Sequence, residues 1–537
     1  MENHYTNIKS LIENTKDKIG KPVSSHVVAA TIESFGIREK DTMDDFGFAT
    51  IHDLAELVFY ELNTDRYYEG AKNLKELEAE ATQPKTIQVS DYLRVKTQIF
   101  AKYYSLGIFH LLPVLIQIVA IIFFGYSLWT FVGFNEVQST AVVLGVIIGM
   151  IATGGFVKVI GKQASFYWNY EDYLMTNKTI NYLHKVGMIS IFSVLAVIFL
   201  VNFFFHIYPY EVLFVVFAYA FLVGMLLLFL APLHTIEKRW VITIAIFTGT
   251  TIAIILKEYT ILLTFVTHWI GIAIAIIISK LFLMIYFSKL TKNKKTISGE
   301  IIRVPVLLYH NYQYFFYGIF IYVFIFIDRI LAWSSSINGN IPFLIYFEKN
   351  YELGMDLAIL IFLLLAGVLE YSIASFTKFI DIGQKITDHK SPEVFNNQLK
   401  KMYWQQVLML FATSVGAFVL VYYIATASWG FKGQFHEELL LISIRVCILG
   451  GIGYVLLAWG MLNALYLFTL GQAMKPLLAI VYACMLNIIV GFVLSRFFAY
   501  DYSVIGMLCG AALFVALTLK ANISFFKNLD YYYYAAY

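Results

Sequence analysis

The sequence predicts an all-α polytopic membrane protein with about twelve transmembrane helices in two six-helix bundles, preceded by a small helical soluble domain. Of the 537 residues, 59% are hydrophobic and 14% are charged, whereas soluble domains carry about 25% charged residues. The mean hydropathy is +0.70. The apolar residues come in long blocks separated by short polar connections. We therefore expect most of the chain to be embedded in lipid, so that the membrane bilayer is a binding partner of the protein.

Residues 1–100 are predicted to form a cytoplasmic helical module. They carry 12 basic and 17 acidic side chains, and the remaining residues carry 27 and 19. Helices are expected at 4–18, 24–36, 50–62 and 68–81, with a turn at 44–47 and Thr50 as the N-cap of the third helix. An acidic head on a basic membrane body is not the charge pattern of a nucleic-acid-binding protein, so no nucleic-acid partner is expected.

Twelve apolar blocks follow, each close to the roughly 20 residues that a helix needs to cross about 30 Å of hydrocarbon. They lie at 106–132, 139–160, 186–208, 211–232, 240–257, 260–286, 304–333, 355–376, 404–427, 439–469, 474–496 and 502–520. The expected domains are a first bundle at 105–287, a basic cytoplasmic linker at 288–303, a second bundle at 304–520 and a cytoplasmic tail at 521–537. Because six is even, both bundles enter the membrane in the same sense, as parallel halves do.

The distribution of basic residues predicts that both termini are cytoplasmic. Lys and Arg concentrate on the cytoplasmic side of a bacterial inner membrane protein. With the N-terminus inside, the inner connections hold Lys162, Lys178, Lys185, Lys238, Arg239, Lys289, Lys292, Lys294, Lys295, Lys378, Lys385, Lys390, Lys400, Lys401, Lys475 and Lys527. The outer connections and their flanks hold only Lys257, Lys349, Lys432 and Arg496. We expect a multi-pass protein of the bacterial inner membrane.

Motifs for catalysis or cofactor binding are weak. The stretch from Gly155 to Gly161-Lys162 has phosphate-loop character, but its spacing is one residue too long and no Ser or Thr follows the lysine. The three cysteines lie in apolar blocks without zinc spacing. A membrane transferase needs acidic residues in a large outer loop, and the longest one, 334–354, offers only Glu348 and Glu352. We expect neither an enzyme nor a cofactor or metal site.

Four charged residues inside the predicted spans are candidates for substrate translocation. Asp328 and Arg329 are adjacent near the outer end of the seventh span, Arg445 lies about two turns inside the tenth, and Glu370 lies in the inner part of the eighth. A charge in the membrane costs about 2.5–3.5 kcal/mol or more unless it is paired or hydrated. Neighbouring helical residues point about 100° apart, so Asp328 needs another partner, and Arg445 is the candidate. Snorkelling to the outer headgroups is the alternative for both arginines.

Uncharged polar residues give further candidates. The seventh span holds His310, Asn311 and Gln313, and the first span holds His110 and Gln117, in both cases toward the cytoplasmic side. We expect Gln117, His310, Asn311 and Gln313 to contact the translocated substrate. Asn202, Asn463 and Asn487 either join such a cavity or form hydrogen bonds between helices.

The seventh span carries a family resemblance. It reads Phe315-Phe316-Tyr-Gly-Ile-Phe-Ile-Tyr-Val-Phe-Ile-Phe-Ile327-Asp328-Arg329-Ile-Leu-Ala-Trp333, which is similar to a signature of the PelG family of Pel exopolysaccharide transporters. Further similar stretches are 351–356, 370–379 and the C-terminal part from Arg445 to 531. The resemblance implies a member of the multidrug/oligosaccharidyl-lipid/polysaccharide (MOP) flippase superfamily, with two bundles around a central cavity that work by alternating access. It also implies partners: a cytoplasmic glycosyltransferase and other membrane subunits of an export complex.

The sequence thus favours an inner-membrane, flippase-like transporter that exports a Pel-like exopolysaccharide. A cation-coupled exporter of small molecules or drugs with the same architecture is an alternative, as is a polytopic glycosyltransferase. The drug exporter needs a membrane-embedded carboxylate in the first bundle. We expect none there, because Glu136, Glu171, Glu211 and Glu258 lie in loops or at helix ends.

Overall fold

The computed structural model describes residues 2–20, 22, 24–63, 101, 104, 107, 112–292, 303–335, 343–386, 392–427, 439–469 and 471–527. The chain divides into two compact units. One comprises Met1–Ala101, Ala374–Trp404 and Phe525–Tyr537, and the other comprises Lys102–Ile373 and Gln405–Ser524. The predicted helix at 68–81 and the predicted linker at 288–303 fall wholly or mostly outside the described residues, as does His110.

The N-terminal part of the first unit is helical, as predicted. It contains α1 (Glu2–Ile19), α2 (Ser25–Ser34), α3 (Glu39–Asp41), a π-helical turn (Thr42–Phe46) and α4 (Ile51–Asn63). Its apolar core includes the fully buried Val28, Ile32, Leu54 and Val58. The predicted cap is confirmed, because the Asp53 amide donates to the Thr50 hydroxyl at 3.2 Å.

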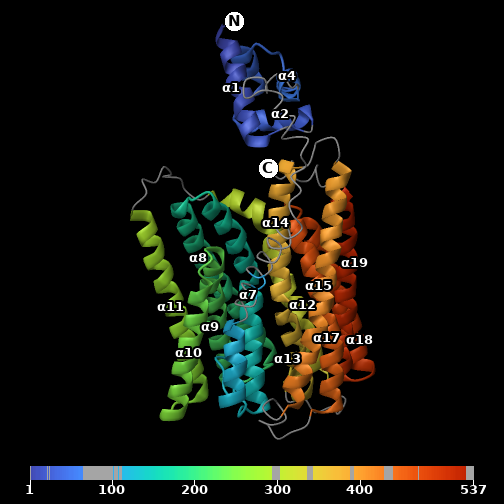
Figure 1. The fold of residues 1–537 in the computed structure, drawn as a ribbon. Helices are drawn as coiled ribbons and strands as arrows, with labels where there is room; N and C mark the ends of the chain where they lie inside the picture. Colours follow the sequence, from blue (N-terminus) through green and yellow to red (C-terminus); the bar gives the residue numbers. More distant parts are fainter. Residues whose placement is uncertain are drawn as a thin grey trace. The chain divides into compact units, whose positions relative to one another are not determined.

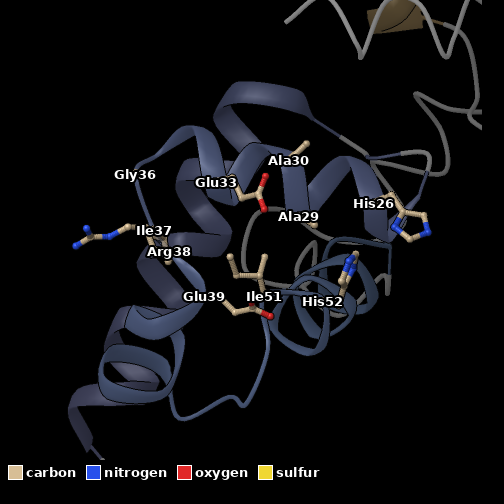
Figure 2. Close-up of a pocket in the computed structure, with 10 residues that line it drawn as sticks. All are labelled: His26, Ala29, Ala30, Glu33, Gly36, Ile37, Arg38, Glu39, Ile51 and His52. Atoms are coloured by element: carbon tan, nitrogen blue, oxygen red, sulfur yellow. The ribbon is translucent and has the colours of Figure 1, made fainter.

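A surface pocket of about 670 Å³ opens on this module (Figure 2). Its wall includes Ala29 and Ile51, and the rings of His26 and His52 meet edge to face at 5.3 Å. Its ionisable lining side chains are exposed. The pocket therefore holds no buried charge, in contrast to the membrane body.

The rest of the described chain is built from long apolar helices, which Figure 1 shows packed side by side. In order, these are α7 (Glu136–Asn169), α8 (Tyr173–Phe205), α9 (Tyr210–Thr235), α10 (Arg239–Tyr259), α11 (Thr264–Lys292), α12 (Val304–Trp333), α13 (Lys349–Leu364), α14 (Ala366–Ile386), α15 (Pro392–Thr426), α17 (Leu441–Thr469), α18 (Met474–Phe497) and α19 (Ser503–Lys527). Eleven candidate spans lie among the described residues, and α13 and α14 together form one of them. The polytopic all-α fold class is confirmed.

The first predicted span differs from the structure. The helix expected to continue to 132 ends at Phe124. Gly125 takes a positive φ of 63°, and the chain reverses, so that Tyr126 and Phe131 form an isolated antiparallel bridge. A left-handed residue cannot continue a right-handed helix, so Gly125 ends it.

The buried apolar residues of the second unit form two clusters. One joins α7, α8, α9, α10 and α11, and the other draws mainly on α12, α13, α17, α18 and α19. Helix α7 contributes to both and lies against α12. At their contact, a Cβ on Gly154 would lie 2.5 Å from the Gly318 carbonyl oxygen. Only glycine permits this approach, so the two clusters meet at a close helix crossing.

Candidate functional site

Asp328 and Arg329 of α12 are both buried. Asp328 is 0% exposed and Arg329 is 3% exposed. A buried guanidinium does not reach headgroups, so the snorkelling alternative does not describe Arg329. Both residues must be neutralised or paired inside the protein.

Their partners come from α13. The Tyr351 hydroxyl donates to Asp328 Oδ2 at 2.7 Å. The Arg329 Nη1 atom forms ion pairs with Glu352 and, at 3.1 Å, with Asp356. Two helices thus bring three carboxylates and one guanidinium together, and we call Asp328, Arg329, Glu352 and Asp356 the charged cluster.

The start of α13 decides this geometry. The sequence placed Glu352 in an outer connection and began the helix at 355, but α13 begins at Lys349. Tyr351 and Glu352 are consequently buried in the helix, at 0% and 4% exposure. Gly354 brings α13 close to α17, because a Cβ there would lie 2.6 Å from the Ser443 carbonyl oxygen.

The charged cluster has more acid than base. If all of its members are ionised, the three carboxylates outnumber Arg329, and Asp328 Oδ1 and Glu352 Oε2 have no hydrogen-bond partner within the described part of the chain. The Asp356 side chain is 61% exposed. A charged carboxylate at membrane depth is stable only beside water or a partner, so we expect water to reach the cluster through Asp356.

Arg445 does not pair with Asp328, so that expectation is wrong. It forms an ion pair with Asp501, and its Nη1 lies 3.3 Å from the Tyr502 hydroxyl. Arg445 lies on α17, whose first turn contacts the short 3-10 helix Tyr500–Tyr502, whereas Asp328 faces α13. The Arg445 side chain is 45% exposed, so snorkelling remains compatible with its position.

The other candidate residues lie away from the charged cluster. Glu370 on α14 pairs with Arg239 at the start of α10, at 2.7 Å. Asn311 is buried and donates to Gln163 at 3.0 Å and to the Leu307 carbonyl oxygen. Seventeen residues of α12 separate it from Asp328, which is about 25 Å along a helix.

His310 is exposed, and the Gln313 amide donates to the Tyr312 hydroxyl at 3.1 Å. Gln117 is fully engaged in the first apolar cluster: it donates to Thr250 at 2.7 Å and accepts from the Leu128 amide at 2.9 Å. These contacts hold helices together, which is the ordinary role of a buried amide in a membrane protein.

The three asparagines also bond within the helical body. Asn202 pairs with the backbone of Tyr208 in both directions. Asn463 donates to Thr518 and accepts from Asn522. Asn487 donates to the Phe324 carbonyl oxygen at 3.4 Å. These contacts agree with hydrogen bonding between elements rather than with a cavity.

Outside the helices, burial changes the acidity of two groups next to the site. Burial raises the pKa of the Glu348 carboxyl above its ordinary value. Burial also raises the pKa of Tyr208 to about 12, although its hydroxyl donates to the Ile345 carbonyl oxygen. Glu348 is the residue directly before α13.

The donor set does not resemble a metal site. Among the described residues, no group of three or more His, Cys, Asp or Glu side chains is arranged as metal ligands. The guanidinium of Arg329 lies at the carboxylates of Glu352 and Asp356, where it repels a second cation. Because its carboxylates outnumber its guanidinium, the cluster can take up protons.

The fold and the charged cluster together define a polytopic helical membrane protein with an ionisable site among its helices. Comparison with known proteins agrees at the level of fold. A MOP-superfamily transporter from Pyrococcus furiosus aligns at 13% identity over 80% of this chain and 97% of its own, with a TM-score of 0.55. A mutant of the Vibrio cholerae MATE transporter VcmN aligns at 13% identity over 82% and 99%, also with a TM-score of 0.55.

An inward-facing multidrug resistance MATE family transporter is also similar, with 13% identity over 78% of this chain and 95% of its own, and a TM-score of 0.53. No family model and no curated protein sequence matches this chain. Identities this low establish the fold alone. The chain has the fold of MOP-superfamily transporters, and this likeness does not single out the PelG family.

Proposed function

We propose that this protein is a proton-coupled exporter of small molecules with the MOP-superfamily fold. The charged cluster is the observation that carries this proposal. Arg329 pairs with the carboxylates of Glu352 and Asp356, the Asp356 side chain is 61% exposed, and two carboxylate oxygens of the cluster are buried without a hydrogen-bond partner among the described residues. The structural neighbours named as multidrug resistance transporters support the exporter function over the alternatives.

Proton exchange at the cluster would drive the transport cycle. When Glu352 or Asp328 takes up a proton, the excess negative charge of the cluster falls by one unit, and protonation of Glu352 weakens its ion pair with Arg329. The cluster links α12 and α13, and α12 lies against α7 at the meeting of the two apolar clusters. A change in α12 therefore reaches the first half of the membrane body directly. This is how protonation would bias the protein toward one side of the membrane.

The proposal includes the orientation of the chain in the membrane. With both termini in the cytoplasm of a bacterial cell, the charged cluster lies toward the outer face of the inner membrane, in keeping with the basic inner connections. Reporter fusions at Gly133, Ser336 and Lys432 should report the outside, and fusions at Lys294 and the C-terminus the inside. An outside signal at Lys294 would contradict the model of two parallel halves.

Polysaccharide export is the second candidate. The similarity of Ile327-Asp328-Arg329 to the PelG signature favours it, and the same residues form the buried part of the charged cluster. In that case the partners are a cytoplasmic glycosyltransferase and other membrane subunits of an export complex. Secreted polymer, measured in cells with and without the gene, distinguishes the two candidates.

The test uses inverted membrane vesicles that contain the full chain. With an inward-acid gradient, the vesicles should accumulate a fluorescent probe, and nigericin, which collapses that gradient, should stop accumulation. We expect Glu352→Gln to abolish gradient-dependent uptake at normal protein level. Gradient-independent accumulation, or no accumulation of ethidium or carboxyfluorescein by the unchanged protein, would overturn proton-coupled small-molecule export.

A further inference from the structure

Two lysines in α7 have no acidic partner. Lys158 and Lys162 are four residues apart, so they share one face of the helix. Both belong to the candidate span Glu136–Asn169. Within the described part of the chain, neither lysine forms an ion pair. Lys158 is partly buried and Lys162 is exposed, and two like charges on one face of a membrane helix are costly unless something anionic or water compensates them.

Aromatic rings of α12 lie beside both amines. The Lys162 Nζ atom is 3.7 Å from the ring centroid of Tyr314, and the Lys158 Nζ atom is 5.8 Å from that of Tyr317. Tyr314 and Tyr317 are buried, at 7% and 1% exposure. A cation–π contact stabilises an ammonium but does not neutralise it. Both amines are therefore directed at rings of α12.

The Tyr314 hydroxyl adds a hydrogen-bond donor to this place. It is buried and has no hydrogen-bond partner in the described residues. An unpaired buried hydroxyl is destabilising. A ligand with an acceptor oxygen would satisfy the hydroxyl and both ammonium groups at once.

The site lies where the two apolar clusters meet. Lys158 is one helical turn from Gly154, at the close crossing with Gly318. The hydrogen bond from Asn311 to Gln163 ties α7 to α12 on the other side of the lysines. A ligand here would contact both halves of the membrane body and would be sensitive to any motion between α7 and α12.

We propose that Lys158, Lys162 and Tyr314 bind an anionic group, a carboxylate or phosphate, of the exported substrate. The two ammonium groups neutralise the anion, the Tyr314 hydroxyl donates to it, and the tyrosine rings pack against an apolar or sugar ring beside it. This deepens the proposed function by naming the substrate class. The substrate is an anion, and its site is separate from the charged cluster, where protons exchange.

The experiment measures binding of carboxyfluorescein, an anionic aromatic probe, to the purified full chain in neutral detergent by fluorescence anisotropy. Lys158→Gln and Lys162→Gln should each weaken binding about tenfold, which corresponds to about 1.4 kcal/mol. Lys158→Arg should retain most of the affinity. The matched control is Lys238→Gln, because the Lys238 Nζ atom also lies over a tyrosine ring, 5.6 Å from the centroid of Tyr286. It should bind like the unchanged protein.

A second experiment distinguishes an exported substrate from a lipid headgroup as the source of the bound anionic group. Binding is repeated in nanodiscs of phosphatidylcholine with and without phosphatidylglycerol. If phosphatidylglycerol displaces carboxyfluorescein, and Lys158→Gln abolishes this competition, the site belongs to the lipid and the substrate assignment is overturned. Unaltered carboxyfluorescein binding in both glutamine variants, no saturable binding by the unchanged protein, or stronger binding of the cation ethidium also overturns it.

The binding assay needs no proton gradient, so the inference and the proposed function fail separately. Glu352→Gln should lose gradient-driven uptake but bind carboxyfluorescein normally. Loss of coupling without loss of binding would support both parts. Normal binding with no gradient-dependent uptake by the unchanged protein would overturn only the proton-coupled transport.

Discussion

The two halves of the membrane body differ in the chemistry of their buried polar contacts. In the first half the hydrogen bonds between buried side chains are neutral: Gln117 bonds to Thr250, Tyr126 to Thr267, and the Tyr219 hydroxyl lies 2.5 Å from His268 Nδ1. Its charged groups Lys158, Lys162 and Arg239 instead contact helices of the second half, α12 and α14. In the second half, the charged cluster and the pair of Arg445 with Asp501 are ionic. The two halves thus have similar apolar interiors but differ in their buried ionisable groups, whose charge changes with protonation.

This difference indicates where the coupling chemistry lies. Neutral hydrogen bonds fix helices in one arrangement and respond little to pH or to the membrane potential. Buried ionic groups have two states, protonated and ionised, and each state favours different neighbours. We therefore expect the first half to act as the more rigid part and the second half to sense protons.

The largest effect on abundance should come from Arg329→Gln. The substitution removes the only cation of the charged cluster and leaves Glu352 and Asp328 buried without it, which should cost about 3–5 kcal/mol. We expect low membrane abundance, measured by immunoblot of purified membranes. Gln117→Leu is the control in the first half and should cost less, because its partners are neutral. Equal losses of membrane abundance in the two variants would contradict the proposed difference between the halves.

Asp328→Asn should separate function from folding. Asparagine has nearly the shape of aspartate, and its side-chain oxygen still accepts from the Tyr351 hydroxyl. We expect nearly normal abundance but loss of gradient-driven export, measured together in the same membranes. Full export at normal abundance would exclude Asp328 from the mechanism, and low abundance would make it a structural residue.

The sequence predicted part of this site for a simple physical reason. Asp328 and Arg329 are conspicuous because they interrupt a run of Phe, Ile and Tyr in a long apolar block. Glu352 and Asp356 were missed because they lie at a helix end, where hydropathy does not place the boundary. The available signal was their spacing, since residues four apart share one helix face once the helix begins before Glu352.

Other features could not be derived from the pattern of residues. The pairing of Arg445 with Asp501 depends on which helix ends meet, and periodicity does not encode which elements pack together. The cation-coupled alternative was expected to need a membrane-embedded carboxylate in the first bundle, whereas the buried carboxylates among the described residues are Asp328, Glu352 and Asp501, all in the second half. Eleven of the twelve predicted spans correspond to long helices of the described residues, because the bilayer fixes the length and the apolar composition of a span.

Two matched tyrosine-to-phenylalanine substitutions, one in each half, test the difference between the halves with a smaller expected loss of stability. Tyr351→Phe removes the donor to Asp328, and Tyr219→Phe removes the contact with His268. Each should destabilise the protein by about 1–3 kcal/mol, because each leaves a buried group unpaired. Only Tyr351→Phe should shift the pH dependence of export, since it alone contacts an ionisable group of the charged cluster. Equal shifts in both variants would place proton sensing in both halves.

The smallest effect on stability is expected from the pair of Arg445 and Asp501. This pair tests whether a partly exposed ion pair of the second half contributes to stability or to the pH dependence of export. The Arg445 side chain is 45% exposed and Asp501 is 3% exposed. Asp501→Asn leaves an arginine that water or headgroups can solvate, so the cost should be about 0–1 kcal/mol. Arg445→Gln should cost more, because the buried Asp501 then loses its cation.

Thermal unfolding of the detergent-solubilised protein measures the stability of both variants, and the pH profile of export is the second readout. We expect both variants to keep the normal profile. A shifted profile in Asp501→Asn would extend the proton site beyond the charged cluster to the start of α19.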